Sequence, residues 1–313
     1  MTEDANHRRV LYVSPMDYDA NPAVDSVAQG LAHRLSEAGV ETHVAFADFR
    51  TPDGGARLLQ SAVDAALRHG VDAIALWCLN PEPLEGPTRT AQNAGVPLVT
   101  LERPPFAVEA SIPFPNFQQG MYMLDYLATV LKPGARVGVI GGPEISDDDE
   151  LVAGFLYGFD HTELVLLNDP TLDRHRNKTD VAPGGREAAL RLLEDIPEMD
   201  ALIAYNDETM LGTLKALEET ARLGEMLVIS RNGTPEAVRQ IGLGRTHGTW
   251  DLDAPGIGLT LADLLLRRLN GSVNLGGEIV MSPVGRMIHP GNADSWVTYR
   301  DRFPFRELGN ALT

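Results

Sequence analysis

The chain has 313 residues, of which 43% are hydrophobic, and its formal net charge is −18 with a pI near 4.8. A chain of this length can bury a sizeable core, and we expect it to fold as two lobes. The acidic balance argues against nucleic-acid binding, for which a basic patch is expected.

Neither a membrane span nor a disulfide is predicted. No apolar run reaches the roughly 18 residues that a spanning helix needs, and the N-terminal stretch MTEDANHRR has no apolar core of the kind found in a secretory signal. The protein is therefore either cytoplasmic, or periplasmic or extracellular with its signal peptide absent from this sequence. The single cysteine, Cys78, lies in the apolar segment AIALWCL and is predicted to be a buried core thiol.

Strand and helix patterns alternate along the first part of the chain. In order, we predict strand Arg9–Ser14, a helix that starts at Asn21-Pro22 and stops at Gly39, strand Glu41–Ala47, helix Ala56–His69, strand Ala73–Leu79, a short helix Thr88–Asn93 and strand Pro97–Leu101. Strand–helix repeats with short connections predict a parallel sheet with helices on both faces.

After a proline-rich bend, Ile112–Asn116, the same pattern restarts. We predict helix Phe117–Leu131, strand Arg136–Ile140, helix Asp149–Phe159, strand Glu163–Leu167, helix Gly185–Leu193, strand Ala201–Ala204 and the helix after it, strand Met226–Ile229, helix Glu236–Ile241, strand Thr246–Trp250, helix Ala254–Leu269, strand Glu278–Met281 and an irregular tail. The two halves are interpreted as two copies of one α/β architecture.

The corner Tyr205–Glu208 follows a strand and begins a helix, and it is typical of a ligand-binding position in an open parallel sheet. Asn206 can both donate and accept hydrogen bonds. Asp207 is either a helix N-cap or a residue that faces the ligand. We favour Asn206 for the ligand contact and Asp207 for the cap.

Motifs for catalysis, cofactors and metals are missing from the sequence. Gly138–Gly142 follows a strand but lacks the spacing of a nucleotide loop, and there is no phosphate-binding or nucleophile-elbow motif. The histidines are scattered, and Asp147–Glu150 is interpreted as a solvated helix N-terminus instead of a calcium loop. We predict no enzyme activity, no cofactor and no metal site.

Several short segments together resemble the type I periplasmic binding proteins, the family of ribose- and galactose-binding proteins whose ligand core is shared with lac-repressor-like regulators. The segments are Leu79–Pro81, Leu101–Arg103, Asn116–Gly120, Ala204–Glu208 with Leu211-Gly212, and Asn232–Glu236. The resemblance extends over about Arg8 to Met281. It implies a Venus-flytrap fold of two Rossmann-like (flavodoxin-like) parallel-sheet lobes, joined by a three-segment hinge that closes over a ligand.

The resemblance also implies domain boundaries. The N-terminal lobe would contain residues 8–114 and 252–281, and the C-terminal lobe residues 115–251 and 282–313. The chain would cross between the lobes near Phe114, Leu252 and Met281.

Residues at the family's ligand positions have the planar hydrogen-bonding groups and aromatic faces that suit a sugar or polyol. The implied ligand-binding residues are Asp17, Tyr18, Asn80, Glu102, Arg103, Asn116, Asn206, Asn232, Trp250 and Asp251. Arg103 is either a hydroxyl-binding fork or a surface cation, and Trp250 is either a stacking platform or a core residue. Trp77 is interpreted as core.

Some positions depart from the family pattern. Ala23-Val24 stands where the sugar binders often carry an aromatic pair, and Asp147–Leu151 lacks the arginine usual in the first helix of the second lobe. Asn232, preceded by Arg231, replaces a frequent aspartate. A hydroxyl-rich ligand remains the prediction, and an amine or a cyclitol would also suit the acidic groups.

The predicted function is that of a monomeric solute-binding protein that delivers a sugar-like molecule to an ABC importer without catalysis. The alternative is a receptor of the same fold that passes ligand occupancy to a sensor kinase or chemoreceptor at the membrane, or the effector core of a regulator. Few residues precede the first predicted strand, so a DNA-binding domain is not expected.

Overall fold

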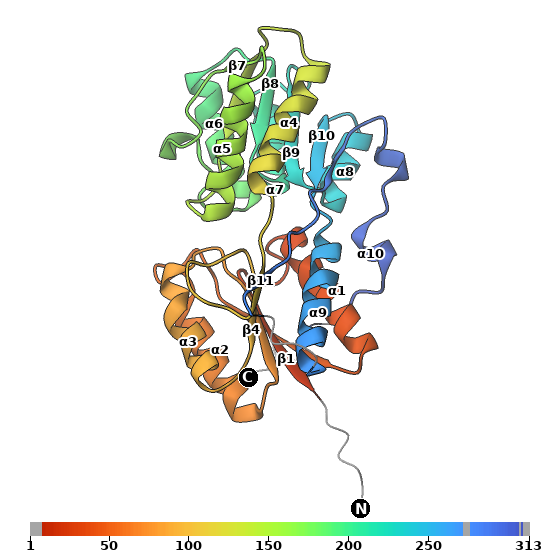
Figure 1. Cartoon of the computed structure of the whole chain (residues 1–313). Helices are drawn as coiled ribbons and strands as arrows, with labels where there is room; N and C mark the ends of the chain where they lie inside the picture. Colours follow the sequence, from red (N-terminus) through yellow and green to blue (C-terminus); the bar gives the residue numbers. More distant parts are fainter. Residues whose placement is uncertain (1–7, 272–275, 307, 309–313) are drawn as a thin grey trace, which may run out of the picture. The chain divides into compact units, whose positions relative to one another are not determined.

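The computed structural model describes residues 8–271, 276–306 and 308, and the chain forms two compact units (Figure 1). Of the described residues, unit 1 contains those up to Phe114, those within Ala254–Pro283 and those from Arg300 onward. Unit 2 contains Pro115–Asp253 and Val284–Tyr299. Within the described residues, no helix combines the length and apolarity that crossing a membrane requires.

Unit 1 is built on a six-stranded parallel sheet in the order β11-β5-β4-β3-β1-β2. Its strands are β1 (Arg9–Ser14), β2 (Glu41–Phe46), β3 (Ala73–Trp77), β4 (Leu98–Leu101), β5 (Ala110–Ile112) and β11 (Glu278–Ile279). The inner order β2-β1-β3-β4-β5 is that of the flavodoxin-like fold, whose ligands bind outside the carboxyl ends of the strands where the order reverses. In unit 1 that point lies between β1 and β3.

Helices cover both faces of this sheet, with α1 and α9 on one side and α2 and α3 on the other (Figure 1). Their bounds are α1 Pro22–Glu37, α2 Ala56–His69, α3 Glu85–Asn93 and α9 Ala254–Leu269, and a 3-10 turn, Glu82–Leu84, precedes α3. The predicted cap of α1 is confirmed, because Asn21 Oδ1 accepts from the Ala23 amide and Pro22 takes the first helical position. Cys78 is buried, and burial raises the pKa of its thiol to about 12, as expected for an inert core residue.

Unit 2 repeats the design with the sheet order β12-β10-β9-β8-β6-β7. Its strands are β6 (Arg136–Ile140), β7 (Val165–Leu166), β8 (Ala201–Ala204), β9 (Leu227–Asn232), β10 (Gly248–Asp251) and β12 (Arg286–Ile288). All pairs are parallel except β10 with β12, which is antiparallel. The predicted fold class, two flavodoxin-like α/β lobes, is confirmed.

The helices of unit 2 pack in pairs, α4 with α5 and α6 with α7. Their bounds are α4 Asn116–Val130, α5 Ser146–Asp160, α6 Ala182–Asp195, α7 Asp207–Glu219 and α8 Pro235–Gly242, with a 3-10 turn at Asp173–His175. A hydrophobic core that includes Leu192, Leu202 and Leu214 is packed on one face of the sheet, and these three side chains are essentially inaccessible to water.

Facing glycines allow three pairs of helices to pack closely. Glycines face each other at Gly30 and Gly258 between α1 and α9, at Gly120 and Gly154 between α4 and α5, and at Gly185 and Gly212 between α6 and α7. A Cβ built at Gly258, Gly154 or Gly212 would lie 2.1 Å from a backbone oxygen of the facing helix. These helix crossings therefore depend on the absence of side chains at the contact.

The structure corrects the predicted elements in three places. Strands β5 and β12 were not predicted, because each has only three residues and lies at a sheet position that periodicity over such a length does not reveal. Strand β9 continues to Asn232, so Ser230 and Arg231 are strand residues and not part of a loop. The tail contains a 3-10 turn, Ala293–Ser295, and the one-turn helix α10, Tyr299–Arg302.

The tail also differs from the expected domain division, which placed residues 282–313 entirely in the second lobe. In the structure, the described residues from Arg300 onward group with unit 1. The contacts explain this: the Phe303 ring stacks on His33 of α1, and the Gln29 side chain bonds the main chain of Arg306.

Candidate ligand-binding site

In unit 1, the predicted residues follow the carboxyl ends of three neighbouring strands. Asp17 and Tyr18 are exposed in the loop after β1, and Asn80 follows β3. The Asn80 amide packs against the backbone of Gly54, where an added Cβ would lie 2.9 Å from Asn80 Nδ2. Because β1 and β3 are adjacent and parallel, the residues after them share one edge of the sheet.

Glu102 and Arg103, both predicted to bind ligand, take different positions after β4. Glu102 is buried with a left-handed φ of 61°, and its carboxylate accepts from the Phe114 amide at 3.4 Å. Arg103 is exposed and lines a cavity of about 660 Å³ together with Phe106, Val108 and Ile279. Among the described residues, Arg103 has no hydrogen bond or ion pair, so its guanidinium is available to a ligand or to solvent.

In unit 2, a buried arginine that was not predicted to belong to the site contacts three side chains. One of them, Asn116, was predicted to bind ligand, and the other two were not. Arg231, only 1% exposed, donates from Nη2 to Asn116 Oδ1 at 2.5 Å and to Asp147 Oδ1 at 3.0 Å, and from Nε to Gln119 Oε1 at 2.9 Å. Asn116 in turn donates to Glu150 at 3.3 Å. The predicted ligand residue Asn116 thus holds a guanidinium at the start of α4 and α5.

Asp147–Glu150 lies in the first turns of α5 as predicted, and Asp149 and Glu150 are exposed, but Asp147 and Asp148 are buried, so the prediction of solvation is wrong for these two residues. Asp148 accepts from Arg176 Nη2 at 2.6 Å and from the Gly142 amide at 2.8 Å. The arginine that the resemblance expected on this helix is therefore supplied by other elements. Arg231 comes from β9, and Arg176 comes from the loop that follows β7. Sequence neighbours could not reveal this pairing, because the partners lie 84 and 28 residues away.

The corner after β8 is arranged differently from the prediction. Asn206, not Asp207, caps α7, since its Oδ1 accepts from the Thr209 amide at 2.8 Å, while its Nδ2 donates to Asp180 at 2.5 Å. Asp207 is fully buried and accepts from Ser230 Oγ, Thr249 Oγ1 and the Thr234 amide at 2.5, 2.6 and 2.7 Å. The Asp207 carboxylate therefore ties the ends of β9 and β10 to the start of α8.

Burial changes the acidity of the two carboxyl groups in this corner. Burial raises the pKa of Asp207 to about 6, although its three hydrogen bonds oppose the change. Burial also raises the pKa of the neighbouring Glu208 to about 7, and the negative charge of Asp207 acts in the same direction.

The remaining predicted residues lie at the ends of β9 and β10 and contact the tail. Trp250 stacks on Tyr122 with ring centroids 5.9 Å apart, and its Nε1 donates to the Val284 carbonyl at 2.8 Å. Asp251 accepts from Trp296 Nε1 at 2.9 Å. Asn232 has a positive φ of 125°, and its carbonyl accepts from the Tyr299 hydroxyl at 2.6 Å.

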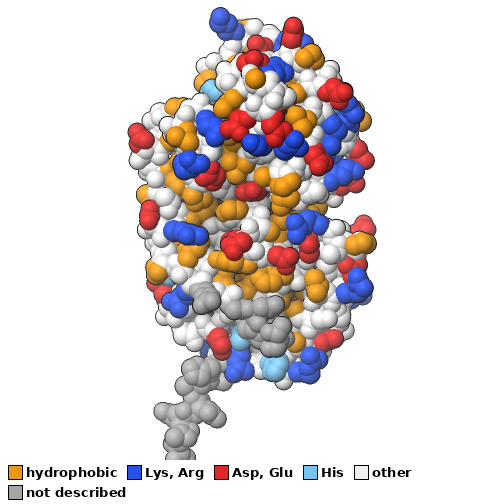
Figure 2. All heavy atoms as spheres, turned by 180° about the vertical axis from the view of Figure 1, so that it is seen from behind, with side chains coloured by type: hydrophobic (Ala, Val, Ile, Leu, Met, Phe, Trp, Pro, Cys, Tyr) orange, Lys and Arg blue, Asp and Glu red, His pale blue; other side chains and the backbone are white. Residues whose placement is uncertain are grey.

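The strand ends of both units carry planar polar side chains. Amide, carboxylate and guanidinium groups follow the strands of each unit and contact one another around Arg231 in unit 2, and such planar groups form the directed hydrogen bonds that hydroxyl-rich molecules require. Among residues 8–271, 276–306 and 308, no three His, Cys, Asp or Glu side chains are grouped to hold a metal ion. Acidic and basic side chains are interspersed over the face seen in Figure 2, and no patch of basic side chains alone is seen on that face.

Two α/β units of one flavodoxin-like order, with polar side chains at the carboxyl strand ends of each, define the Venus-flytrap class of solute-binding proteins. The family model described as "Periplasmic binding protein domain" matches residues 11–272, and the chain belongs to this family.

Individual relatives agree with this membership. The chain is 25% identical over 224 residues to the ribose import binding protein RbsB of Bacillus subtilis, with 71% of this chain and 69% of that protein aligned. It is 27% identical over 222 residues to the xylitol-binding protein of Mycolicibacterium smegmatis, with 66% and 60% aligned. Its fold is similar to the periplasmic binding protein of an arabinose ABC transporter from Shewanella sp. ANA-3, solved with bound L-arabinofuranose, at a TM-score of 0.79, 16% identity and 92% and 93% coverage.

Proposed function

We propose that this protein binds a small hydroxyl-rich solute, a sugar or polyol, and presents it to an ABC importer without chemical change. The observation that carries the proposal is the set of polar side chains at the carboxyl strand ends of both sheets, in a chain whose family match extends over residues 11–272. Relatives whose names specify ribose or xylitol support the class of ligand.

The solute would contact both units, and the units would close around it. Asp17, Tyr18, Asn80, Glu102 and Arg103 are the proposed contacts from unit 1. From unit 2, the proposed contacts are Asn116, Asn206, Asn232, Trp250 and Asp251. Of these, Arg103 and Asp17 are exposed, so replacing them tests ligand contact with little effect on the fold.

The proposal is tested by thermal unfolding with a panel of D-ribose, L-arabinose, xylitol and myo-inositol. We expect at least one of these compounds to raise the midpoint of unfolding, because a ligand that binds only the folded state stabilises it by RT ln(1 + [L]/Kd), about 2.7 kcal/mol at 100 times Kd. Arg103→Ala and Asp17→Asn should abolish most of that rise while leaving the midpoint of the ligand-free protein unchanged.

The matched control is Arg57→Ala. Arg57 lies in α2, its side chain is 88% exposed, and it pairs with Asp53, which precedes the helix. This variant should respond to ligand as the parent does. A panel without any stabilising compound, or an unchanged response in both site variants, would contradict the proposal.

Delivery to an importer places the protein in the periplasm or outside the cell, as a monomer that meets a membrane permease. Stimulation of a reconstituted permease–ATPase pair by the loaded protein tests this role. Activation of a sensor kinase in its place would assign the protein to ligand sensing.

A further inference from the structure

The chain passes between the two units four times, which is one crossing more than a three-segment hinge requires, and the additional crossing lies in the C-terminal segment. The boundaries of the units fall at Phe114–Pro115, Asp253–Ala254 and Pro283–Val284, and a further one falls at Tyr299–Arg300. The first three connect successive parts of the two sheets. The fourth belongs to residues 296–306, which add no strand to either sheet and which we call the strap.

In unit 2, the strap is anchored on two residues of the proposed site. Trp296 donates from Nε1 to Asp251 Oδ2 at 2.9 Å, and the Tyr299 hydroxyl donates to the Asn232 carbonyl at 2.6 Å. Tyr299 is 1% exposed, and its ring lies 5.6 Å from that of Trp296. A buried tyrosine and a buried tryptophan that both satisfy their polar atoms form a specific anchor instead of a loose tail contact.

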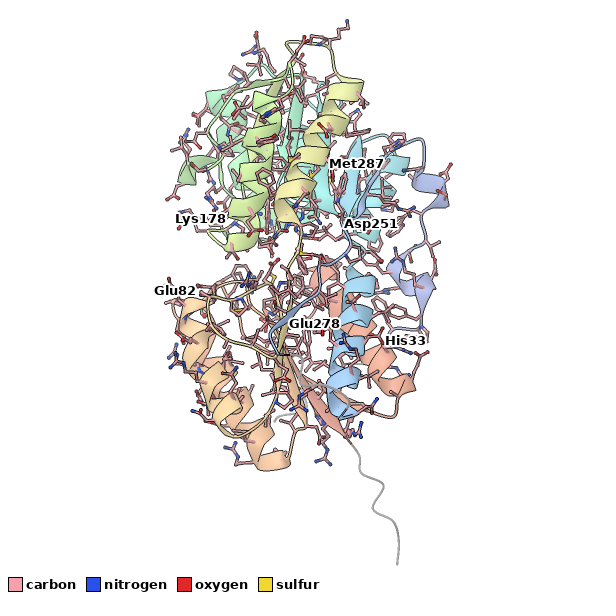
Figure 3. All side chains as sticks on the ribbon, viewed as in Figure 1. His33, Glu82, Lys178, Asp251, Glu278 and Met287 are labelled. Carbon is pink, nitrogen blue, oxygen red and sulfur yellow. The ribbon has the colours of Figure 1, made fainter. Side chains whose placement is uncertain are left out.

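In unit 1, the strap is anchored on α1. Gln29 donates from Nε2 to the Arg306 carbonyl and accepts on Oε1 from the Arg306 amide, both at 2.7 Å. The Phe303 ring stacks on His33 at 4.6 Å with an interplanar angle of 8°. Figure 3 labels His33 on α1 and Asp251 at the end of β10, one residue from each anchor.

The unit 1 anchor also reaches the proposed site. Gln29, which is 1% exposed, donates from Nε2 to the Tyr18 hydroxyl at 3.2 Å as well as to Arg306. One side chain therefore connects the strap to the loop after β1. The unit 2 end of the strap contacts Asn232 and Asp251, which the proposed function assigns to ligand binding, and its unit 1 end is connected to Tyr18 through Gln29.

We propose that the strap is a functional part of the binding site, in which Gln29, Trp296 and Tyr299 are positioning residues and the connection limits how far the two units separate. The assignment of Tyr18, Asn232 and Asp251 to ligand rests on the proposed function, whereas the limit on separation does not. The restraint follows from the short chain between the anchors.

The reach of the strap can be estimated from backbone geometry. Tyr299 and Phe303 are four residues apart, and the residues between them form the single turn of α10. Four residues extend over about 6 Å as a helix and about 14 Å when fully extended. An isolated turn has little stability of its own, so unwinding α10 allows roughly 8 Å of extra length before an anchor must break.

The limit on separation is measured by distances between spin labels on the two units, without ligand. Cysteines are introduced as Arg57→Cys and Glu198→Cys, at side chains that are 88% and 84% exposed, in a Cys78→Ala background. We expect Gln29→Leu and Phe303→Ala each to add a component at longer distance. Either variant suffices if the other does not fold.

The control is Gln92→Leu, which removes a glutamine bond to a backbone carbonyl, that of Ala107 at 2.7 Å, elsewhere in unit 1. It should keep the parent distribution. An unchanged distribution in the strap variants, or an equal change in Gln92→Leu, would overturn the restraint.

The positioning role is measured by affinity for whichever of D-ribose, L-arabinose, xylitol and myo-inositol stabilises the parent. Tyr299→Phe and Trp296→Phe should raise Kd by about 3- to 10-fold, the scale of one or two hydrogen bonds. Tyr126→Phe, which removes a tyrosine bond to the His247 carbonyl at 3.2 Å, should leave Kd unchanged. If Tyr299→Phe and Trp296→Phe bind the compound as tightly as the control Tyr126→Phe does, the positioning role is overturned. If no compound binds the parent, the proposed function fails with the positioning role, and the spin-label distances alone decide the restraint.

Discussion

At the scale of single residues, the most informative group is the Asp207 carboxylate. It is fully buried, its partners among the described residues are hydroxyl and amide donors and include no cation, and its pKa is raised to about 6 from an ordinary value of 3.8. A group of this kind makes the folded state bind a proton more tightly than the unfolded chain does.

The sign of the pH effect follows from this difference. Well below the ordinary value of 3.8, at about pH 3, both states are protonated at this position and the stabilisation is complete. As pH rises from about 4 to about 6, the unfolded chain releases the proton first, so stability falls by about 3 kcal/mol in total.

Asp207→Asn should remove this part of the decline, so that the difference in unfolding free energy between parent and variant shrinks or reverses toward pH 6. Urea unfolding at pH 4, 5 and 6 measures the difference, and parallel curves would show that Asp207 does not titrate in this range.

The second prediction at residue scale concerns the buried pair of Arg231 and Asp147. Removing one member leaves the other charge buried without compensation, so Arg231→Met should cost about 3–5 kcal/mol. Combining it with Asp147→Leu should recover part of that loss. Urea unfolding of the two single variants and the double variant measures the coupling, and a double variant that equals the sum of its parts would argue against a direct pair.

At the scale of elements, the facing glycines set the distance between paired helices. In Gly258→Ala the new Cβ would lie 2.1 Å from the Val27 carbonyl oxygen, so α9 must move away from α1. We expect a net loss of about 1–2 kcal/mol, the cost of overpacking less the gain in helix propensity.

The matched control is Gly242→Ala at the end of α8, where nothing lies within 4 Å of the added methyl group. It should be neutral or stabilising by up to about 1 kcal/mol. Thermal and urea unfolding separate the two variants, and equal effects would show that the close helix contact has no energetic role.

At the scale of the whole molecule, the proposed function predicts a change of dimensions on binding. If two units close around a solute, the radius of gyration should fall when a stabilising compound from the panel saturates the protein. Small-angle X-ray scattering with and without that compound measures the change. Sugar that stabilises the protein without changing its radius would support binding but not closure.

Much of the fold could be predicted from short-range patterns. The cap formed by Asn21 and the proline after it marked the start of α1, and the apolar run of β8 followed by the helical spacing of α7 marked a strand–helix unit. These signals are local, because capping, backbone restriction and periodic burial act within a few residues. Their alternation was sufficient for the flavodoxin-like class, whereas the short strands β5 and β12 were too brief to be recognised.

The candidate site was predictable only in outline. The positions after strands could be expected to carry ligand groups, but the partner of each group could not. Asp147 was predicted to be a solvated residue at the start of a helix, but the sheet order brings Arg231 beside it from 84 residues away. Asn206 forms the cap that was expected of Asp207, whereas Asp207 is held inside unit 2 by donors from Ser230 and Thr249 on neighbouring strands.

The sequence by itself determined the alternation of strands and helices, the two-fold repetition of the architecture and the family to which the chain belongs, since all three are carried by local spacing and short segments in order. Only the tertiary structure decided which charges are buried together and where the tail lies. A side chain's partner, such as Trp296 for Asp251, depends on which strand ends and loops the fold brings side by side. No local pattern contains that information.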